Sequence, residues 1–234
     1  MTVRALLFDV QGTATDFFST VRTAAVQILG SRHPEQDWST FVNAWRAAYF
    51  DAVGVLTPTD GPWTSIESVY RSALDALLMQ SGLDEVTDSE RVELNRAWRR
   101  LQPWPDTVPG LLRLRTKYTL ATLSNADVSA IVEISRRGEL PWHAIFTAEM
   151  AAAFKPDPRT YLMASRYLGH DPNDIMMVAS HKYDLRAAAQ LGFATAFVAR
   201  PLEYGDPVLA DVEFSDEFDI NATDFEDLAT QLGV

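Results

Sequence analysis

A carboxylate ends the first apolar segment of the chain, in the stretch FDVQGTATD (8–16). Asp9 follows the apolar run ALLF and precedes Gly12 and Thr13, residues typical of a tight turn. A strand that ends in this way presents its carboxylate at the edge of a sheet, where it can act as a nucleophile. Many phosphate-handling enzymes carry a second carboxylate two positions later, and in this chain that position is Gln11. An amide cannot give or take a proton at useful cost. If Asp9 is a nucleophile, its reaction must therefore need no proton donor at position 11.

Polar side chains also follow the later apolar segments. They are Ser124 and Asn125 after TLATL (119–123), Lys155 after AIFTA (144–148), and Ser180, His181, Lys182 and Asp184 after DIMMVA (174–179). Singly, each has an ordinary structural explanation, such as a helix cap, an Asx turn or a solvated lysine. Since the carboxyl ends of parallel strands meet at one edge of a sheet, their placement at successive strand ends predicts a single site around Asp9.

Short apolar segments alternate with helical patterns over much of the chain. The segments 4–8, 119–123, 144–148, 174–179 and 195–199 are typical of buried strands, and the patterns 127–138, 157–169 and 183–192 are typical of helices that end in glycine. This alternation predicts an α/β fold, a Rossmann-like core with a parallel sheet and helices on both faces.

Residues 16–105 differ, because helical patterns follow one another there without a strand candidate. The stretch QPWPDTVPG (102–110) then indicates a Pro-rich hinge. We therefore expect two units: a core domain of residues 1–15 and 106–234, and an all-helical cap subdomain of residues 16–105 inserted after the first strand. The cap would emerge beside Asp9.

The composition argues against several classes of function. The net charge of −12 disfavours nucleic acid as a partner, since nonspecific binding needs a basic surface. The absence of cysteine excludes disulfides and zinc–thiolate sites. No apolar run approaches the roughly 20 residues of a membrane span, and the N-terminal run, which ends in Asp9, is too short for a signal peptide. We expect a cytoplasmic protein that does not bind membranes.

Four motifs occur in the order and spacing of a known family. FDVQGT, LSNA, AFKPDPRTY and VASHKYDLRAAAQLGF together resemble the haloacid dehalogenase superfamily over essentially the whole chain. The resemblance implies that Asp9 is the nucleophile and that Ser124 and Lys155 bind the reacting group. Phosphatases of the superfamily also bind Mg²⁺ through acidic residues of the fourth motif, where this chain has Ala179 and Ser180. This loss and the amide in the first motif both point away from metal-assisted phosphoryl transfer.

A halide leaving group removes the need for both the acid and the metal, because it departs as a stable anion. AFKPDPRTY, with Tyr161, and WRAAY (45–49), with Arg46, resemble the (S)-2-haloacid dehalogenase branch. The resemblance implies a hydrolase that acts on carbon–halide bonds without metal or cofactor and converts small 2-haloalkanoic acids into 2-hydroxyalkanoic acids. Asp9 would attack the α-carbon, and water would then cleave the aspartyl ester.

The resemblance also implies roles for the other polar side chains. Lys155 orients the Asp9 carboxylate and keeps it ionised, and Asp184 positions Lys155 or the hydrolytic water. His181 stands where these dehalogenases usually carry Asn, which leaves two roles open: a base for the ester-cleaving water, or a hydrogen-bonding group only. The residues expected to bind substrate or halide are Gln11, Thr13, Arg46, Ser124, Asn125, Tyr161 and Ser180.

Two other functions stay open at the level of sequence. A phosphatase or phosphonatase-like hydrolase could use the same scaffold, although the cap lacks the lysine that a Schiff-base phosphonatase needs. The chain could also be a noncatalytic member that binds a ligand or a partner through its cap, but the presence of Asp9, Lys155 and Asp184 together speaks against this. Relatives often pair through the cap helices, so the resemblance also admits a homodimer.

Overall fold

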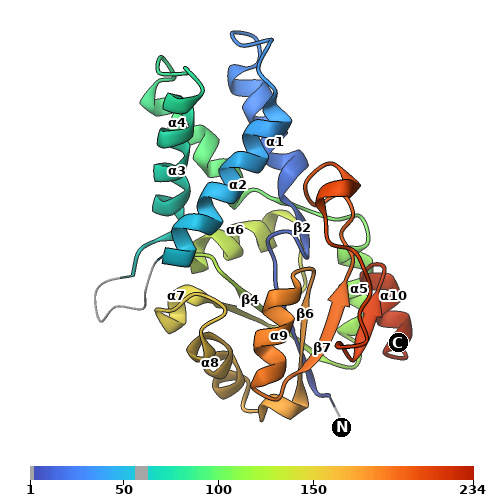
Figure 1. Cartoon of the computed structure of the whole chain (residues 1–234). Coiled ribbons are helices and arrows are strands. Elements are labelled where there is room, and N and C mark those ends of the chain that lie inside the picture. The colour runs from blue at the N-terminus through green and yellow to red at the C-terminus, as the bar shows by residue number, and fades with distance from the viewer. Residues whose placement is uncertain (1–2, 56–62) are drawn as a thin grey trace.

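The computed structural model of the chain describes residues 3–55 and 63–234 (Figure 1). Within these residues the core is a six-stranded sheet in the order β5-β4-β1-β6-β7-β8, with parallel pairings. Its strands are β1 (Ala5–Phe8), β4 (Thr119–Ser124), β5 (Ala144–Thr147), β6 (Ile175–Ala179), β7 (Ala194–Val198) and β8 (Ile220–Ala222). The α/β fold and the five predicted strands are confirmed. The sequence does not predict β8, because INA, with an asparagine at its centre, gives no apolar run.

Alternating side chains of the strands fill one hydrophobic core on each face of the sheet. Leu6 and Phe8 pack in the core beneath α5 (Thr107–Leu114), α6 (Val128–Arg137) and α10 (Phe225–Gln231). Ala5 and Leu7 pack in the opposite core, beneath α8 (Pro158–Leu168) and α9 (Lys182–Gln190). The core domain also contains the short helices α7 (Ala148–Ala151), η2 (Pro172–Asp174) and η3 (Pro207–Leu209). Helices therefore cover both faces of the sheet, as predicted (Figure 1).

The cap consists of helices that stand above the sheet (Figure 1). They are α1 (Phe17–Leu29), α2 (Trp38–Val55), α3 (Ile66–Gln80), α4 (Asp88–Asn95) and the short η1 (Arg96–Arg99). Buried aromatic rings join them: Tyr70 stacks on Trp98 with ring centroids 4.0 Å apart, and Trp45 meets Trp98 edge-on at 5.5 Å. Large rings of this kind contribute much of the apolar area that a small helical unit can bury. No helix of the described residues is both long and apolar enough to cross a membrane.

A two-stranded antiparallel ribbon joins the cap to the core. β2 (Thr15–Asp16) pairs with β3 (Gln102–Pro103), so the chain enters and leaves the cap side by side. We propose that the core domain and the cap subdomain divide at this ribbon, between 15 and 16 and between 105 and 106. Residues 56–62 of the cap lie outside the described residues.

The hinge is shorter than the predicted range 102–110, because α5 already begins at Thr107. Pro109 lies in the first turn of this helix, where a missing backbone N–H costs nothing. Gly110 does not end the segment either. It lies against Phe225 of α10, where an added Cβ would be 2.5 Å from the Phe225 Cβ. In the sequence, Pro109 and Gly110 indicate a hinge. In the structure, Pro109 lies in the first turn of α5, and Gly110 allows α5 to pack closely against α10.

A buried ion pair ties this hinge to the core. Arg200, which follows β7, bonds both carboxylate oxygens of Asp106 at 2.8 and 2.9 Å, and its Nε donates to the backbone carbonyl of Thr13 at 2.7 Å. The guanidinium carbon also lies 4.8 Å from the ring centroid of Phe225. Burial alone would raise the pKa of Asp106, but Arg200 outweighs burial and holds that pKa below its usual value. Removing either partner would leave the other charge buried and unpaired.

Arg200→Leu should lower the free energy of unfolding by about 3 kcal/mol, because it leaves the Asp106 carboxylate buried without its cation. Urea unfolding followed by circular dichroism measures the change. Arg186→Leu is the matched control, because Arg186 also binds a carboxylate with two nitrogens, that of Glu217, but in an exposed pair. For this variant a loss below about 1 kcal/mol is expected. If both variants lost the same free energy of unfolding, the buried pair would not contribute more to stability than the exposed pair.

Candidate active site

Asp9 lies directly after β1, and its backbone N–H donates to the carbonyl of Val178 at 3.0 Å. Because β1 lies between β4 and β6, the ends of all three strands meet around this carboxylate. A small cavity lies between Asp9 and the cap. The cavity is lined by Asp9, Gln11, Arg46, Tyr49, Phe50, Ser124, Asn125, Lys155, His181 and Tyr183.

Lys155 holds the first oxygen of the Asp9 carboxylate. Its ammonium donates to Asp9 Oδ1 at 2.9 Å and to the carbonyl of Leu123 at 3.0 Å, and it also bonds Asp184 Oδ2. The side chains of the lysine and both carboxylates are almost inaccessible to solvent. Burial alone would lower the pKa of Lys155, but the two carboxylates outweigh burial and raise that pKa. A permanent positive charge therefore lies beside Asp9.

Two of the predicted substrate-binding residues support this lysine. The Asn125 side chain bonds the Lys155 backbone at both ends: its Oδ1 accepts from the N–H at 2.7 Å and its Nδ2 donates to the carbonyl at 3.1 Å. Tyr161 lies behind Asp184, donates to its Oδ1 at 2.5 Å and does not line the cavity. Burial raises the pKa of Asp184, although Lys155 acts in the opposite direction. Asn125 and Tyr161 thus fix the Lys155–Asp184 pair, and of the two only Asn125 reaches the cavity.

Hydroxyl groups contact both oxygens of Asp9. Thr13 Oγ1 donates to Asp9 Oδ2 at 2.8 Å and accepts from the backbone N–H of Ser180 at 2.9 Å. The Ser180 hydroxyl lies 3.0 Å from the Thr13 hydroxyl. Ser124 Oγ donates to Asp9 Oδ1 at 3.4 Å and lines the cavity. Ser124 is therefore open to a ligand, whereas Thr13 and Ser180 lie behind the nucleophile and orient it.

His181 faces the second oxygen of Asp9. Its Nδ1 lies 3.4 Å from Asp9 Oδ2, and its Nε2 lies 2.8 Å from Glu203 Oε1. Burial alone would lower the pKa of His181, but the carboxylates of Glu203 and Asp9 outweigh burial and raise that pKa to about 10. Burial likewise favours a higher pKa for Asp9, while Lys155 and His181 hold it well below its usual range. At neutral pH, before the ester forms, the nucleophile is therefore an ionised carboxylate between two cations, Lys155 and the protonated His181.

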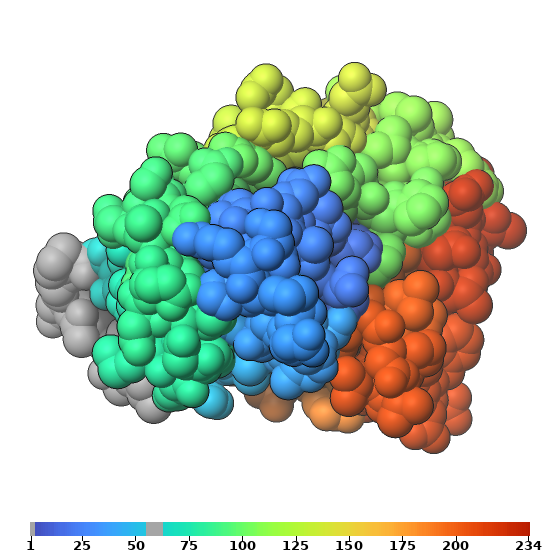
Figure 2. All heavy atoms as spheres, turned by 90° about the horizontal axis from the view of Figure 1, so that it is seen from above, coloured from blue at the N-terminus to red at the C-terminus, as the bar shows by residue number. Residues whose placement is uncertain are grey.

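Glu203 is a site residue that the sequence patterns did not single out. The segment that carries its buried side chain packs on the cap: Asn43 donates to the carbonyl of Tyr204 at 3.0 Å, and the Tyr204 ring meets Phe17 edge-on at 5.6 Å. Figure 2 shows this orange segment against the blue helices of the cap. The rule applied to the ends of the earlier strands, extended to the fifth strand, leads to RPLE (200–203) and would have found it.

Arg46 reaches the cavity from α2 of the cap. Its Nη1 donates to Gln11 Oε1 at 3.3 Å and to the Tyr70 hydroxyl, and its Nη2 donates to the Gln11 carbonyl at 3.3 Å. The guanidinium carbon lies 4.5 Å from the ring centroid of Phe50 and 4.9 Å from that of Phe17, as in cation–π contacts. Its Nε is buried and has no hydrogen-bond partner among the described residues. Gln11 thus joins the first motif to a cap cation that faces the cavity.

The cavity does not suit a divalent metal ion. Arg46, Lys155 and His181 already bring three cationic groups to its lining, which repel a further cation. In residues 3–55 and 63–234 no cluster of three or more His, Asp and Glu side chains is arranged to hold a metal. Lys182 does not join the site as its strand-end position suggests, because it pairs with the exposed Asp211 at 2.7 Å. The Mg²⁺ site of the superfamily's phosphatases therefore does not fit these residues.

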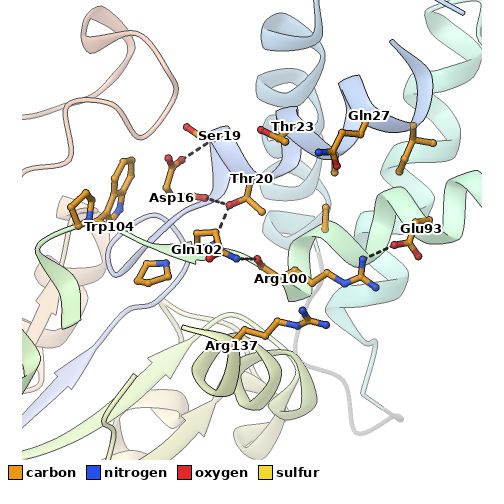
Figure 3. A pocket seen from close by; sticks show the side chains of 15 residues that line it. Asp16, Ser19, Thr20, Thr23, Gln27, Glu93, Arg100, Gln102, Trp104 and Arg137 are labelled. Atoms are coloured by element: carbon orange, nitrogen blue, oxygen red, sulfur yellow. Dashed lines mark hydrogen bonds and ion pairs between the residues drawn. The ribbon is translucent and has the colours of Figure 1, made fainter. Parts of the chain in front are cut away.

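A larger groove runs along the hinge between α1, η1 and α6 (Figure 3). Some of its polar groups have partners within the groove: Arg100 pairs with Glu93 at 2.5 Å, and the backbone N–H of Gln102 donates to Thr20 at 3.1 Å. A groove of this size could hold a ligand. The ionised nucleophile Asp9, however, lines the smaller cavity and not the groove, so the chemistry belongs to the smaller cavity.

Comparisons with known proteins agree with this geometry. The model of the haloacid dehalogenase-like hydrolase family matches residues 3–192, and the chain belongs to this family. The (S)-2-haloacid dehalogenase of Pseudomonas putida is 26% identical over 201 residues, which cover 85% of each chain. Crystal structures of two L-2-haloacid dehalogenases, one of them defluorinating, match with TM-scores of 0.92 and 0.89 at 36% and 35% identity. These two matches cover 99% of this chain and 96% and 100% of the others.

Gly12→Ala should displace Glu203 and lower the pKa of His181 from about 10 toward its usual value. Gly12 has a φ of +97°, and an added Cβ would lie 2.2 Å from Glu203 Oε1. The ring protons of His181, followed by NMR across pH, report this pKa. Gly82→Ala is the control, because Gly82 has a φ of +68° but open space around it. It carries the same backbone strain of about 1–2 kcal/mol and should leave the His181 pKa unchanged. An unchanged His181 titration in Gly12→Ala would contradict the assigned contact.

Proposed function

We propose that the chain is a hydrolytic dehalogenase that converts small 2-haloalkanoic acids into 2-hydroxyalkanoic acids through an aspartyl ester on Asp9. The observation that carries the proposal is the state of the nucleophile, an ionised carboxylate held by Lys155 in a cavity where Gln11 offers only an amide. A halide leaves as a stable anion, so the displacement needs no acid at that position. The L-2-haloacid dehalogenases that match at 36% and 35% identity support the proposal.

In the first step an oxygen of Asp9 attacks the α-carbon of the haloacid, and the carbon–halide bond breaks as the ester bond forms. Lys155 keeps the carboxylate ionised and oriented. Arg46 brings a positive charge to the cavity from the cap, and its buried Nε has no hydrogen-bond partner among the described residues. A buried cation of this kind stabilises the negative charge of a departing halide. Ser124, whose hydroxyl lines the cavity and lies at the long distance of 3.4 Å from Asp9 Oδ1, is left for the substrate carboxylate.

In the second step water attacks Cγ of the ester. Negative charge then grows on Oδ1 of Asp9, where Lys155 at 2.9 Å and Ser124 at 3.4 Å donate hydrogen bonds. Donors that are already in place at the oxygen where charge develops lower the barrier, because they need no reorganisation during the reaction. Asp184 and Tyr161 keep the lysine in this position.

The cavity favours small substrates. It is narrow, and the rings of Tyr49, Phe50 and Tyr183 form part of its lining. Tyr49 and Phe50 come from the cap, and the Tyr49 hydroxyl donates to the core carbonyl of Asn125 at 3.1 Å. The cap is thus closed on the core over the nucleophile, which excludes bulk water from the displacement.

The alternative functions fit these residues less well. A phosphatase would need a proton donor at position 11 and a metal site, but Gln11 is engaged by Arg46 and the cavity is lined by cations. A noncatalytic binding protein would have no need for an ionised carboxylate buried against Lys155, since burying such a pair brings little stability.

We further infer that the protein acts in the cytoplasm as a homodimer. Absence of cysteine suits a reducing compartment. On the cap, the side chains of Ala44, Ala48, Ser72 and Ala76 line a shallow groove between α2 and α3, where small residues allow a second helix to approach closely. Light scattering of the purified protein tests the assembly; a monomer at micromolar concentration would rule it out.

Halide release from both enantiomers of 2-chloropropionate, measured in EDTA, tests the proposed reaction. The wild-type protein should release chloride, and Asp9→Asn should lower the rate by at least about 10³-fold, because the amide cannot attack the α-carbon. Asp211→Asn is the control, since it changes an exposed carboxylate outside the cavity and should leave the rate unchanged.

A phosphoester with Mg²⁺, assayed in parallel, separates the two kinds of hydrolase. Phosphate release that depends on Mg²⁺, without chloride release, would rule out the dehalogenase function. It would also mean that a residue other than Gln11 supplies the proton to the leaving group.

A further inference from the structure

Cleavage of an aspartyl ester has a leaving group of its own. Water breaks the bond between Cγ of Asp9 and the oxygen that attacked the substrate, so that oxygen departs with the product as its hydroxyl oxygen. The departing group is an alkoxide, a far stronger base than a halide ion. The second step of the proposed reaction therefore needs a proton at the attacking oxygen, although the first step needs none.

The two oxygens of Asp9 have different neighbours. Lys155 and Ser124 donate hydrogen bonds to Oδ1. An oxygen that carries the negative charge of the tetrahedral intermediate requires such donors. Oδ2 accepts from the Thr13 hydroxyl at 2.8 Å and lies 3.4 Å from His181 Nδ1, and of these two neighbours only His181 lines the cavity. This arrangement suits an Oδ2 that attacks the substrate, leaves with the product and takes its proton from the imidazole.

Lys155 is poorly placed to give that proton. An ammonium has three N–H groups, and in Lys155 they bond Asp9 Oδ1, the Leu123 carbonyl and Asp184. Giving up a proton would leave the buried carboxylate of Asp184 without its cation. His181 is free of this constraint, because its Nδ1 faces Asp9 alone and its Nε2 keeps a separate partner, Glu203.

Glu203 keeps the imidazole charged after the ester has formed. Esterification removes the negative charge of Asp9, one of the two carboxylates that favour the protonated ring. Glu203 Oε1 remains, 2.8 Å from Nε2, on a side chain that is only 5% exposed. In such a poorly solvated place the attraction between a carboxylate and an imidazolium is much stronger than in water.

The cap and the first motif together hold Glu203 in this position. Its neighbour Tyr204 accepts from Asn43 of α2, and an added Cβ at Gly205 would lie 2.1 Å from the ring of Phe18. On the other side, the Cβ-free Gly12 lets the carboxylate approach the turn after β1. The Glu203–His181 pair is thus assembled where the core, the cap and the turn of the nucleophile meet.

We propose that His181 is the general acid of ester cleavage and that Glu203 positions His181 and keeps it protonated. The proposal rests on the dehalogenase function and gives the histidine a role opposite to that of a base. His181 is a catalytic residue in this scheme, because it touches the reacting oxygen of Asp9. Glu203 is a positioning residue, because it acts through the imidazole.

The step balances in atoms and charge. A bond forms between the oxygen of water and Cγ of Asp9, and the electron pair of the C=O bond moves to Oδ1 beside Lys155. When this pair returns, the bond between Cγ and Oδ2 breaks, its electrons stay on Oδ2, and Oδ2 takes the proton from His181 Nδ1. One proton of the former water, now on the new carboxyl group, restores the imidazolium. The other is released to solvent as Asp9 returns to its carboxylate.

Pre-steady-state kinetics with an excess of (S)-2-chloropropionate separate the two steps, because chloride reports displacement and 2-hydroxypropionate reports ester cleavage. His181→Asn should release one equivalent of chloride per site in a burst, while ester cleavage slows by about 10²–10⁴-fold. Mass spectrometry should then find the ester on the peptide that contains Asp9. Lys182→Gln is the matched control, because Lys182 is the next residue but pairs with Asp211 away from the cavity. It should leave both steps unchanged.

The pH dependence of kcat tests Glu203 apart from any loss of folding. Ester cleavage needs the imidazolium, so kcat should fall as pH rises through the pKa of His181, which is about 10 in the unmodified site. Glu203→Gln removes the remaining carboxylate and should move this alkaline limb at least about one pH unit lower, because each unit reflects a tenfold change in the proton equilibrium. A purely structural role for Glu203 would lower kcat without moving the limb.

Three outcomes would overturn the inference. The first is His181→Asn protein that releases chloride and hydroxyacid at equal, wild-type rates without ester accumulation. The second is an alkaline limb that is the same in Glu203→Gln and wild type. The third, no chloride release from the wild type, would remove the dehalogenase function itself and is distinguished because neither chloride nor hydroxyacid forms. If His181→Asn fails to fold by circular dichroism, His181→Gln and the Glu203→Gln pH profile decide.

Discussion

One buried chain of alternating charges holds the site together: Asp184, Lys155, Asp9, His181 and Glu203. A carboxylate or an ammonium taken out of water alone is costly, but here each cation lies between two carboxylates. The order of the strands lays these groups out across the sheet, with Lys155 beyond β5, Asp9 after β1, His181 after β6 and Glu203 after β7. The topology of the core is therefore what brings the nucleophile, its two cations and their counter-charges into contact.

The turn after β1 must be fixed for this chain to form, and the hinge of the cap fixes it. Trp104 Nε1 donates to the carbonyl of Gly12 at 2.9 Å, the Thr107 hydroxyl donates to that of Ala14 at 2.9 Å, and Arg200 holds the carbonyl between them. These donors come from the segment through which the chain leaves the cap and from the end of β7. The same few contacts thus set both the position of the cap and the geometry of the nucleophile. The hydrogen bonds between Gln11 and Arg46 add a fourth contact of this kind.

Periodicity was enough to predict five of the six strands and the helical insertion from sequence. Strand-end position pointed to Asp9, Gln11, Ser124, Asn125, Lys155 and His181, which line one cavity, whereas Arg46 was expected only from the family resemblance. The prediction failed where tertiary contacts decide. Nothing local in the motif AFKPDPRTY shows that Tyr161 turns behind Asp184 instead of into the cavity. Asn125 was expected to contact halide, but both ends of its side chain hold the backbone of Lys155. The charge of His181 depends on Glu203, a residue more than twenty positions away that reaches it only through the fold.

The leaving groups of the two reaction steps explain why an amide at position 11 and a histidine at position 181 suit this site. In a phosphatase the proton is needed at the leaving group of the first step, which is where a carboxylate at position 11 would stand. A halide needs no such proton, so Gln11 can serve instead to hold Arg46. The proton is needed one step later and at a different atom, the oxygen of Asp9 itself. His181 lies beside this oxygen, Oδ2, and can donate the proton. Glu203 keeps His181 protonated after the ester has formed and Asp9 has lost its negative charge.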